Sequence, residues 1–219
     1  MTYWAASMST RVAAVKPGRP VQFGRERDLA GDKASRIVEA MRVSVATRGI
    51  AGSTFDHVAR EAGVSRGLLH YYFGTKDRLL VEAVRRESDV QIERLEAGIA
   101  QAGSAEDVIA AMVRVLEDFL GEAPVSSVAF LEMVSLAQRN DDIAAELAEL
   151  GRRTRTHLAD ALLAKSRAGV FELRTKPEAA ATFLYALADG ITIRRLSEPE
   201  LDIGPLVEQA AIAARALLS

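Results

Sequence analysis

Residues 65–76, SRGLLHYYFGTK, bring donor side chains and flat aromatic rings into one short stretch. Ser, Arg, His and Lys side chains donate hydrogen bonds to phosphate oxygens and to the edges of bases. Aromatic residues make up only 5% of the chain, yet three of them stand side by side here. The combination is typical of a surface that contacts DNA. The alternative, in which YYF is buried core and Arg66 is a solvated charge, stays open from these residues alone.

Helical spacing divides this stretch into two faces. In a helix that begins at Ser65, Leu69 and Phe73 lie four residues apart and face inward. The opposite face then meets the major groove, where the first turns of a recognition helix contact bases. We predict that Arg66 donates two hydrogen bonds to a guanine. The candidate DNA-contacting residues are Ser53, Thr54, Ser65, Arg66, Gly67, Leu68, His70, Tyr71, Tyr72 and Lys76, with phosphate contacts expected at Ser53, Thr54, Ser65, His70 and Lys76.

The residues around this helix have the spacing of a helix-turn-helix. Ser53 is the expected N-cap of a preceding short helix, whose apolar stripe is Phe55, Val58, Ala59 and Ala62. Gly63 suits the left-handed position that ends this helix, and Ser65 caps the next one. Gly74 ends the second helix, and Thr75 then caps a longer helix that starts at Lys76. The turn between the two short helices contains Gly, as the motif requires.

The charge distribution separates the chain into two parts. Residues 1–80 carry 13 Lys and Arg against 7 Asp and Glu, whereas residues 81–219 carry 15 against 23, within a net charge of −2. An asymmetry of this kind indicates that only the first part meets a polyanion.

The rest of the chain predicts an all-α protein with about nine helices, because apolar residues recur at helical spacing and no strand-like alternation appears. We expect a flexible N-terminal arm over residues 1–30 and a helix-turn-helix DNA-binding domain of three helices over residues 31–76. A larger helical domain for effector binding and dimerisation is expected over residues 77–219.

Several classes of function are disfavoured. The chain has no Cys and only three His, at His57, His70 and His157, and it has no Gly-rich phosphate loop or nucleophile elbow. We therefore expect no enzymatic activity, no metal and no cofactor. No apolar run approaches the roughly 20 residues that span a bilayer. The expected location is the cytoplasm, and no membrane partner is expected.

Residues 32–80, with TFDHVAREAGVSRGLLHYYFGTKDRLL at their centre, resemble the DNA-binding domain of tetracycline-repressor-like (TetR family) regulators. The AREAGVS turn, the YF near the end of the second helix and the step into a long helix carry the resemblance. The family often has Thr or Ser where Leu68 stands and Tyr where His70 stands. The resemblance implies a homodimeric transcriptional regulator, usually a repressor, that binds double-stranded DNA at a pseudo-palindromic operator. It also implies that a small molecule bound to the C-terminal domain releases the DNA.

Two further regions have candidate roles. KPGRP, residues 16–20, resembles the minor-groove core of AT-hook-like arms, and Arg19 is its candidate DNA contact. A disordered tail with incidental basic residues is the alternative for this segment. The last two expected helices, near residues 177–197 and 205–218, are apolar on more than one side and are predicted to form the homodimer. The alternative is that these apolar faces belong to the core of a single chain.

A largely apolar effector site is expected between the helices of the second domain. Its candidate residues are Met112, Leu116, Phe119, Phe130, Met133, Leu136, His157 and Phe183. Two alternatives remain: a DNA-binding regulator with no small-molecule effector, and a helical enzyme or carrier whose helix-turn-helix is vestigial.

Overall fold

The computed structural model describes residues 31–121 and 125–218, which form helices and connecting turns without any strand. The helices are α1 (Asp32–Gly52), α2 (Phe55–Ala62), α3 (Arg66–Phe73), α4 (Lys76–Gln101), α5 (Ala105–Leu120), α6 (Val125–Ala137), α7 (Asp141–Arg167), α8 (Pro177–Ser197) and α9 (Gly204–Leu217). For this part of the chain the expected all-α fold with about nine helices is confirmed. Arg19 lies outside the described residues, so its role in an N-terminal arm stays a prediction.

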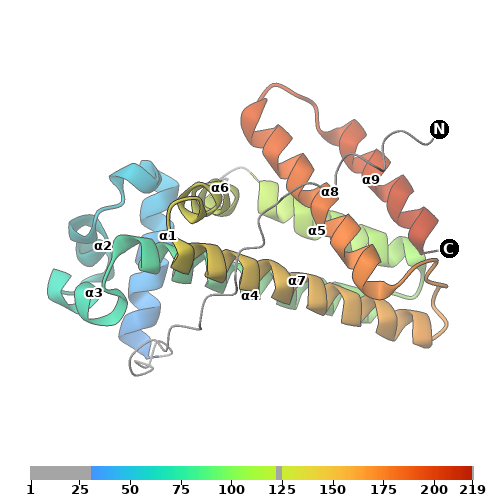
Figure 1. Ribbon diagram of the computed structural model, residues 1–219, viewed down its shortest axis with the longest axis horizontal. Coiled ribbons are helices and arrows are strands. Elements are labelled where there is room, and N and C mark those ends of the chain that lie inside the picture. Colours follow the sequence, from blue (N-terminus) through green and yellow to red (C-terminus); the bar gives the residue numbers. More distant parts are fainter. Residues whose placement is uncertain (1–30, 122–124, 219) are drawn as a thin grey trace.

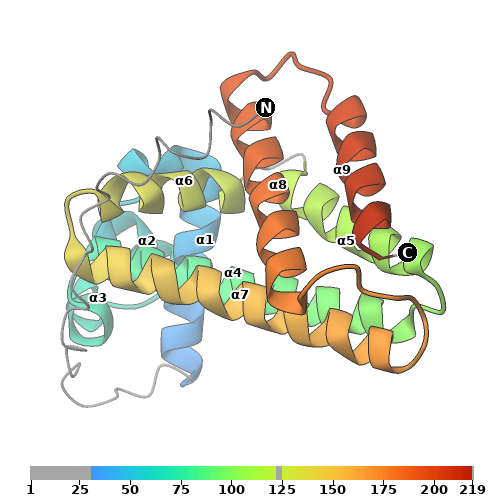
Figure 2. The same cartoon turned by 45° about the vertical axis from the view of Figure 1, so that its right-hand side comes forward.

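The long helices α4 and α7 connect the two ends of the molecule (Figure 1). Helices α1, α2 and α3 lie at one end, and α5, α8 and α9 lie at the other. Helix α4 packs along α7 and also contacts α1, α5 and α6. Seen from the second direction, α8 and α9 still form an outer pair at the end away from α3 (Figure 2). Because α4 reaches both ends, it can transmit a displacement from one to the other.

The helix-turn-helix forms where the sequence predicts it, with one correction at the start of α2. The cap of α2 is Thr54, whose side chain accepts a hydrogen bond from the His57 amide at 3.3 Å. Ser53 was the predicted cap, but it is fully buried and its hydroxyl donates to the Gly49 carbonyl at 2.7 Å. Gly63 ends α2 with φ 64°, the left-handed conformation that glycine adopts without strain.

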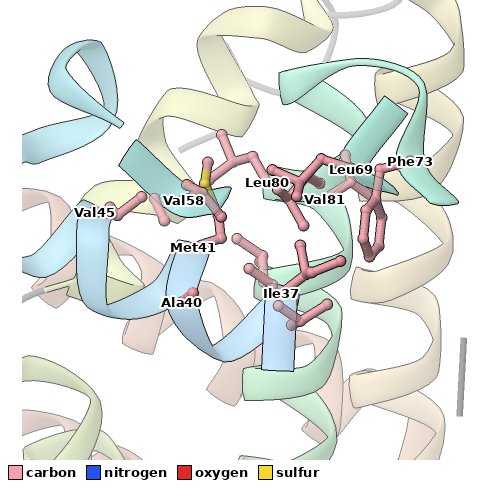
Figure 3. Close-up of a cluster of buried hydrophobic side chains, with 14 of the residues drawn as sticks. Ile37, Ala40, Met41, Val45, Val58, Leu69, Phe73, Leu80 and Val81 are labelled. Atoms are coloured by element: carbon pink, nitrogen blue, oxygen red, sulfur yellow. The ribbon is translucent and has the colours of Figure 1, made fainter. Parts of the chain in front are cut away.

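A cluster of buried apolar side chains, called the head cluster from here on, holds α3 against its neighbours (Figure 3). Leu69 and Phe73 of α3 pack with Met41 of α1, Val58 of α2 and Leu80 of α4. Each of these side chains is at most 5% exposed. Removing this apolar surface from water is the main force that fixes the orientation of α3.

The same cluster extends into the second part of the chain. Ala129 and Met133 of α6, with Ile143 and Leu150 of α7, are buried against it. A separate cluster joins the far half of α4 to α5, α7, α8 and α9. The two ends of the molecule therefore have separate cores, and α4 and α7 contribute to both.

Candidate functional site

The exposed face of α3 carries the donors and rings that the sequence indicates. The Arg66 side chain is 59% exposed and Tyr71 is 58% exposed, whereas Leu69 and Phe73 on the other face are buried. His70 is also exposed. The predicted division of the helix into two faces is confirmed, and the reading of the whole YYF run as core is wrong for its first residue.

Arg66 is held by side chains from two helices. Its Nη1 lies 3.3 Å from both carboxylate oxygens of Asp56, at the start of α2. Its Nε lies 3.5 Å from Nε2 of His70, one turn along α3. The His70 ring also stands edge-on to Phe55, with 4.8 Å between the ring centroids. The guanidinium is thus oriented at the surface of the helix-turn-helix.

The neighbouring candidates on α3 differ in what they can reach. Gly67 and Ser65 are exposed. Ser65 occupies the N-cap position of α3, but its hydroxyl accepts no capping hydrogen bond from the helix. Leu68 and Tyr72 are only half-buried, because both also pack on the head cluster. The Tyr72 ring meets that of Tyr71 edge-on at 5.3 Å.

Ser53 cannot contact a phosphate through its side chain in this conformation. It is fully buried, and its hydroxyl donates a hydrogen bond to the Gly49 carbonyl. Thr54 remains exposed beside it. The sequence offers two adjacent residues able to cap α2, and burial of Ser53 below the turn leaves the capping position to Thr54.

Two basic side chains donate hydrogen bonds to carbonyl groups near the ends of helices α1 and α2. Nζ of Lys76 donates to the Ile50 carbonyl near the end of α1, and the side chain is half-buried. Nη2 of Arg36 donates to the Ala62 carbonyl at the end of α2, with 2.5 Å between the atoms. Cations are favourable at these helix ends, where the carbonyl groups leave a partial negative charge. Lys76 therefore has a structural role at the end of α1, whereas the sequence predicted only a phosphate contact for it.

Replacing Lys76 by Met should lower the stability of the helix-turn-helix end by about 1 kcal/mol, because Met keeps the aliphatic stem but leaves the Ile50 carbonyl without this donor. Denaturant unfolding of the two proteins measures the difference. Lys33→Met, at an exposed lysine of α1, is the matched control and should change little. Equal losses in both variants would show that the contact to Ile50 contributes nothing specific.

A cavity of about 220 Å³ lies within the second part of the molecule. Residues of α4, α5, α6, α7, α8 and α9 line it, and most of them are apolar. Four of the predicted effector-site residues lie in its wall: Met112, Leu116, Phe119 and Phe130.

The other four candidates lie elsewhere. Met133 is fully buried in the head cluster, and Leu136 packs on the same cluster. Nδ1 of His157 lies 2.5 Å from Oε1 of Glu96, so His157 joins α7 to α4. Phe183 is 47% exposed on α8. Helical spacing identified apolar positions, but it does not distinguish a cavity wall from a core or an outer surface.

The cavity has polar groups that the prediction missed. Asp189 and Tyr185 of α8 line it, together with Gln91 of α4. Burial raises the pKa of Asp189 to about 6, although Arg155 nearby opposes the rise. Burial, together with the charge of Asp189, raises the pKa of Tyr185 to about 12. The available signal was Asp189 itself, the lone charge within the otherwise apolar stretch 179–193.

Exposed apolar side chains gather on α8 and α9. The largest are Phe183, Ile193, Leu206 and Ile212, which are 37–52% exposed. Gly190 lies on the same helix as Phe183 and Ile193, and a Cβ atom added there would meet no atom within 4 Å. Exposed apolar side chains on paired helices are typical of surfaces through which proteins associate.

Among the described residues, none of the helices has both the length and the apolar character needed to cross a membrane. The helix-turn-helix with its donor-rich outer face defines a DNA-binding regulator of transcription.

Comparison with known proteins supports this class. Residues 37–83 match the family model "Bacterial regulatory proteins, tetR family", and residues 105–219 match "BetI-type transcriptional repressor, C-terminal". The chain belongs to the TetR family of bacterial transcriptional regulators, and its second part is of the BetI type. The resemblance seen in the sequence is confirmed, and so is the expectation that the chain is not an enzyme.

Individual relatives agree with the family. The HTH-type transcriptional regulator BetI of Rhizobium meliloti (strain 1021) is 29% identical over 177 residues, which cover 81% of this chain and 82% of the relative. The crystal structure of a TetR-family regulator from Rhodococcus sp. has a TM-score of 0.70 and 26% identity, and covers 85% of this chain and 98% of its own. A transcriptional regulator from Saccharomonospora viridis in complex with choline has a TM-score of 0.63 and 24% identity, with 83% and 93% covered.

Proposed function

We propose that this regulator is a homodimeric repressor that leaves a pseudo-palindromic operator when a small molecule occupies the cavity. In this proposal residues 31–76 read DNA, and residues 77–219 bind the effector and form the dimer. The observation that carries the proposal is that α4 belongs both to the DNA-binding end and to the cavity wall. Leu80 is buried with α3 in the head cluster, and Val84, one turn later, lines the cavity.

Each DNA-binding end would insert α3 into the major groove, with Arg66 at base edges and Ser65 and Thr54 near phosphates. The exposure of Arg66 and of its neighbours supports this orientation. In a two-fold dimer the recognition helices of the two subunits lie about 34 Å apart, or somewhat more, one turn of duplex. The operator should accordingly contain two inverted half-sites.

The exposed apolar surface of α8 and α9 is the proposed dimer interface. Phe183, Ile193 and Ile212 supply the apolar area, and Gly190 lets a second helix approach closely. Helices that pack this surface against its symmetry mate would form a four-helix arrangement. A dimer of this kind holds the two recognition helices at one fixed spacing.

Occupation of the cavity changes DNA binding through α4. Cross-helix ion pairs tie α4 to α7, including Arg153 with Asp89 at 2.6 Å and the contact of His157 with Glu96. An effector favours whichever arrangement of these helices fits it better, by its difference in affinity for the two states. If that arrangement spaces the recognition helices wrongly, the operator is released.

The effector is proposed to be a compact organic cation. The aromatic rings of Phe119, Phe130 and Tyr185 line the cavity, and rings attract cations through their faces. Asp189 supplies a negative charge that makes no hydrogen bond within the described part of the chain. The choline held by the structural relative from Saccharomonospora viridis makes choline the first compound to test.

The experiment measures binding to a fluorescent operator with increasing concentrations of choline. Choline should lower operator affinity, whereas 3,3-dimethylbutanol, its neutral analogue of nearly the same shape, should do so far less. Equal effects would contradict the proposed role of charge. Failure of both compounds to raise the temperature of unfolding or to change operator affinity would contradict the cation as effector.

Asp189→Asn should abolish the response to choline and raise stability at pH 7. Its carboxyl has a folded pKa of about 6, above the ordinary value of 3.8, so the folded state holds this proton more tightly than the unfolded state. The stability that this carboxyl provides is present below pH 4 and is lost as the pH rises through about 6. With allowance for solvent screening, the gain in Asp189→Asn at pH 7 should be about 1 kcal/mol.

Thermal unfolding at pH 5 and pH 7 tests this sign, because the advantage of the variant should shrink at the lower pH. Choline binding to the unaltered protein should also weaken below pH 6, as Asp189 takes up a proton. A variant that is less stable than the parent at pH 7, or that responds fully to choline, would contradict the assignment of Asp189.

A further inference from the structure

The contacts of Arg66 extend beyond the one residue expected to read a base. Asp56 stands at the second position of α2 and His70 in the second turn of α3, and both approach the Arg66 guanidinium. Asp56 is itself 60% exposed. A carboxylate at this place is unexpected on a surface that binds a polyanion, because it repels phosphates.

We propose that Asp56 and His70 are positioning residues for Arg66, and that Asp56 raises sequence specificity while lowering affinity for DNA in general. This inference rests on the proposal that Arg66 reads a base. It adds that the direction of the guanidinium is set before DNA arrives, by one side chain on each side.

The hydrogen bonds are arranged so that one edge of Arg66 stays available. Asp56 meets only Nη1, with both of its oxygens at 3.3 Å, and His70 lies nearest Nε. Nη2 makes no hydrogen bond with the described residues. A guanidinium has five N–H donors, and two of them suffice for a guanine. Asp56 and His70 therefore engage Nη1 and Nε, one on each side of the group, and leave the hydrogens of Nη2 for a base.

The ring of His70 is fixed in turn. Its Nδ1 lies 3.1 Å from the Gly74 carbonyl, which only accepts hydrogen bonds, so Nδ1 carries the hydrogen. In the neutral ring Nε2 is then an acceptor that faces the Nε hydrogen of Arg66. The edge-on contact with Phe55 restrains the plane of the ring. A chain of contacts thus runs from the end of α3, through His70 and Arg66, to the start of α2.

The charge of Asp56 has a second consequence. The sequence of α3 contains no acidic residue, so Asp56 is the carboxylate that approaches its first turn. Near bound DNA it favours the registers in which Arg66 meets a base and disfavours loose contacts with phosphates. Specificity arises in part from such repulsion of wrong complexes.

The test compares an operator obtained by selection with a duplex in which the G·C pair read by Arg66 is replaced by A·T. The proteins are the parent, Asp56→Asn, Arg66→Ala and the double variant. Asp56→Asn should reduce discrimination between the two duplexes about threefold to fivefold, the range of an exposed carboxylate–guanidinium pair. It should also raise affinity for unrelated duplexes about twofold or more, since a repulsive charge is removed.

The double variant distinguishes positioning from a general effect. With Ala at position 66, Asp56→Asn should reduce discrimination no further, because there is no guanidinium to orient. Glu61→Gln is the matched control, since it removes a carboxylate from the other end of α2, and it should leave discrimination unchanged. His70→Ala, at an exposed position, should reduce discrimination at the same base pair.

Three results would overturn the inference. In the first, Asp56→Asn discriminates between the two duplexes as the parent does. In the second, Asp56→Asn reduces discrimination by the same factor in the Arg66→Ala protein as in the parent. In the third, Arg66→Ala keeps the parent's preference at every base pair, and this also removes the proposed base contact. A loss of preference in Arg66→Ala with none in Asp56→Asn would overturn the positioning role and leave the proposed function intact.

Discussion

Ile212→Asp in α9 should convert the protein to a monomer and lower operator affinity by more than about 100-fold, because two linked DNA-binding ends gain that much from acting together. Ile212 is 52% exposed, the most exposed of the large apolar residues on α8 and α9. A carboxylate there would be buried without a partner if the two subunits met. The free energy needed to bury that charge destabilises the dimer and not the single subunit. The folded subunit should lose little, since the side chain already faces away from its own core.

Sedimentation equilibrium at micromolar concentration should then find a 23.6 kDa species in place of twice that mass. Val90→Asp provides the matched control, because Val90 is an exposed apolar residue of α4 outside the proposed interface. It should remain dimeric and bind the operator as the parent does. A dimeric Ile212→Asp protein with full affinity would place the interface elsewhere.

Arg66→Ala should cost about 1–3 kcal/mol of operator binding and relax the preference at one base pair in each half-site. The loss is specific to a position because a guanidinium matches the two acceptors of guanine and no other base edge in the same way. Affinity for unrelated duplexes should fall much less, since only one positive charge is removed.

Arg48→Ala is the control for charge alone. Arg48 is an exposed residue of α1 and belongs to neither helix of the α2–α3 pair. Its removal should affect all duplexes alike and leave the order of base preferences intact. If Arg66→Ala behaves in the same way as Arg48→Ala, Arg66 serves as a phosphate contact and the base is read by another residue.

The helix-turn-helix could be predicted almost completely from the sequence, because its signals are local. The stripe of Phe55, Val58, Ala59 and Ala62 is buried as its spacing requires, and Gly63 adopts the left-handed conformation. The inward direction of Leu69 and Phe73 follows from the same periodicity. Such features depend on residues no more than four positions apart.

Ser53 and Lys76 show where local signals end. Ser53 and Thr54 are equally suited to cap a helix, and the choice depends on which hydroxyl the folded turn covers. Lys76 lies 26 positions from Ile50, so no spacing rule reveals that its amine would meet that carbonyl. Both corrections come from tertiary contacts, which a single sequence does not specify.

The cavity was harder to predict for the same reason. Phe119 and Phe183 are each the lone Phe of their helix, yet the first lines the cavity and the second faces outward. His157 was predicted to be one of the few polar groups of the effector site, but the pairing of α4 with α7 brings it to Glu96. Asp189, the single charge in the apolar stretch 179–193, does line the cavity, so it indicated the site better than His157 did.

Selection of bound duplexes from a random DNA library, with the purified full chain at moderate salt, tests the central claim most directly. We expect enrichment of a pseudo-palindrome with half-sites about one helical turn apart, or slightly more. The parallel selection with Arg66→Ala should lose the preference at one position of each half-site. Binding that enriches no sequence, or an enriched site without two-fold symmetry, would contradict a dimeric regulator that reads DNA through α3.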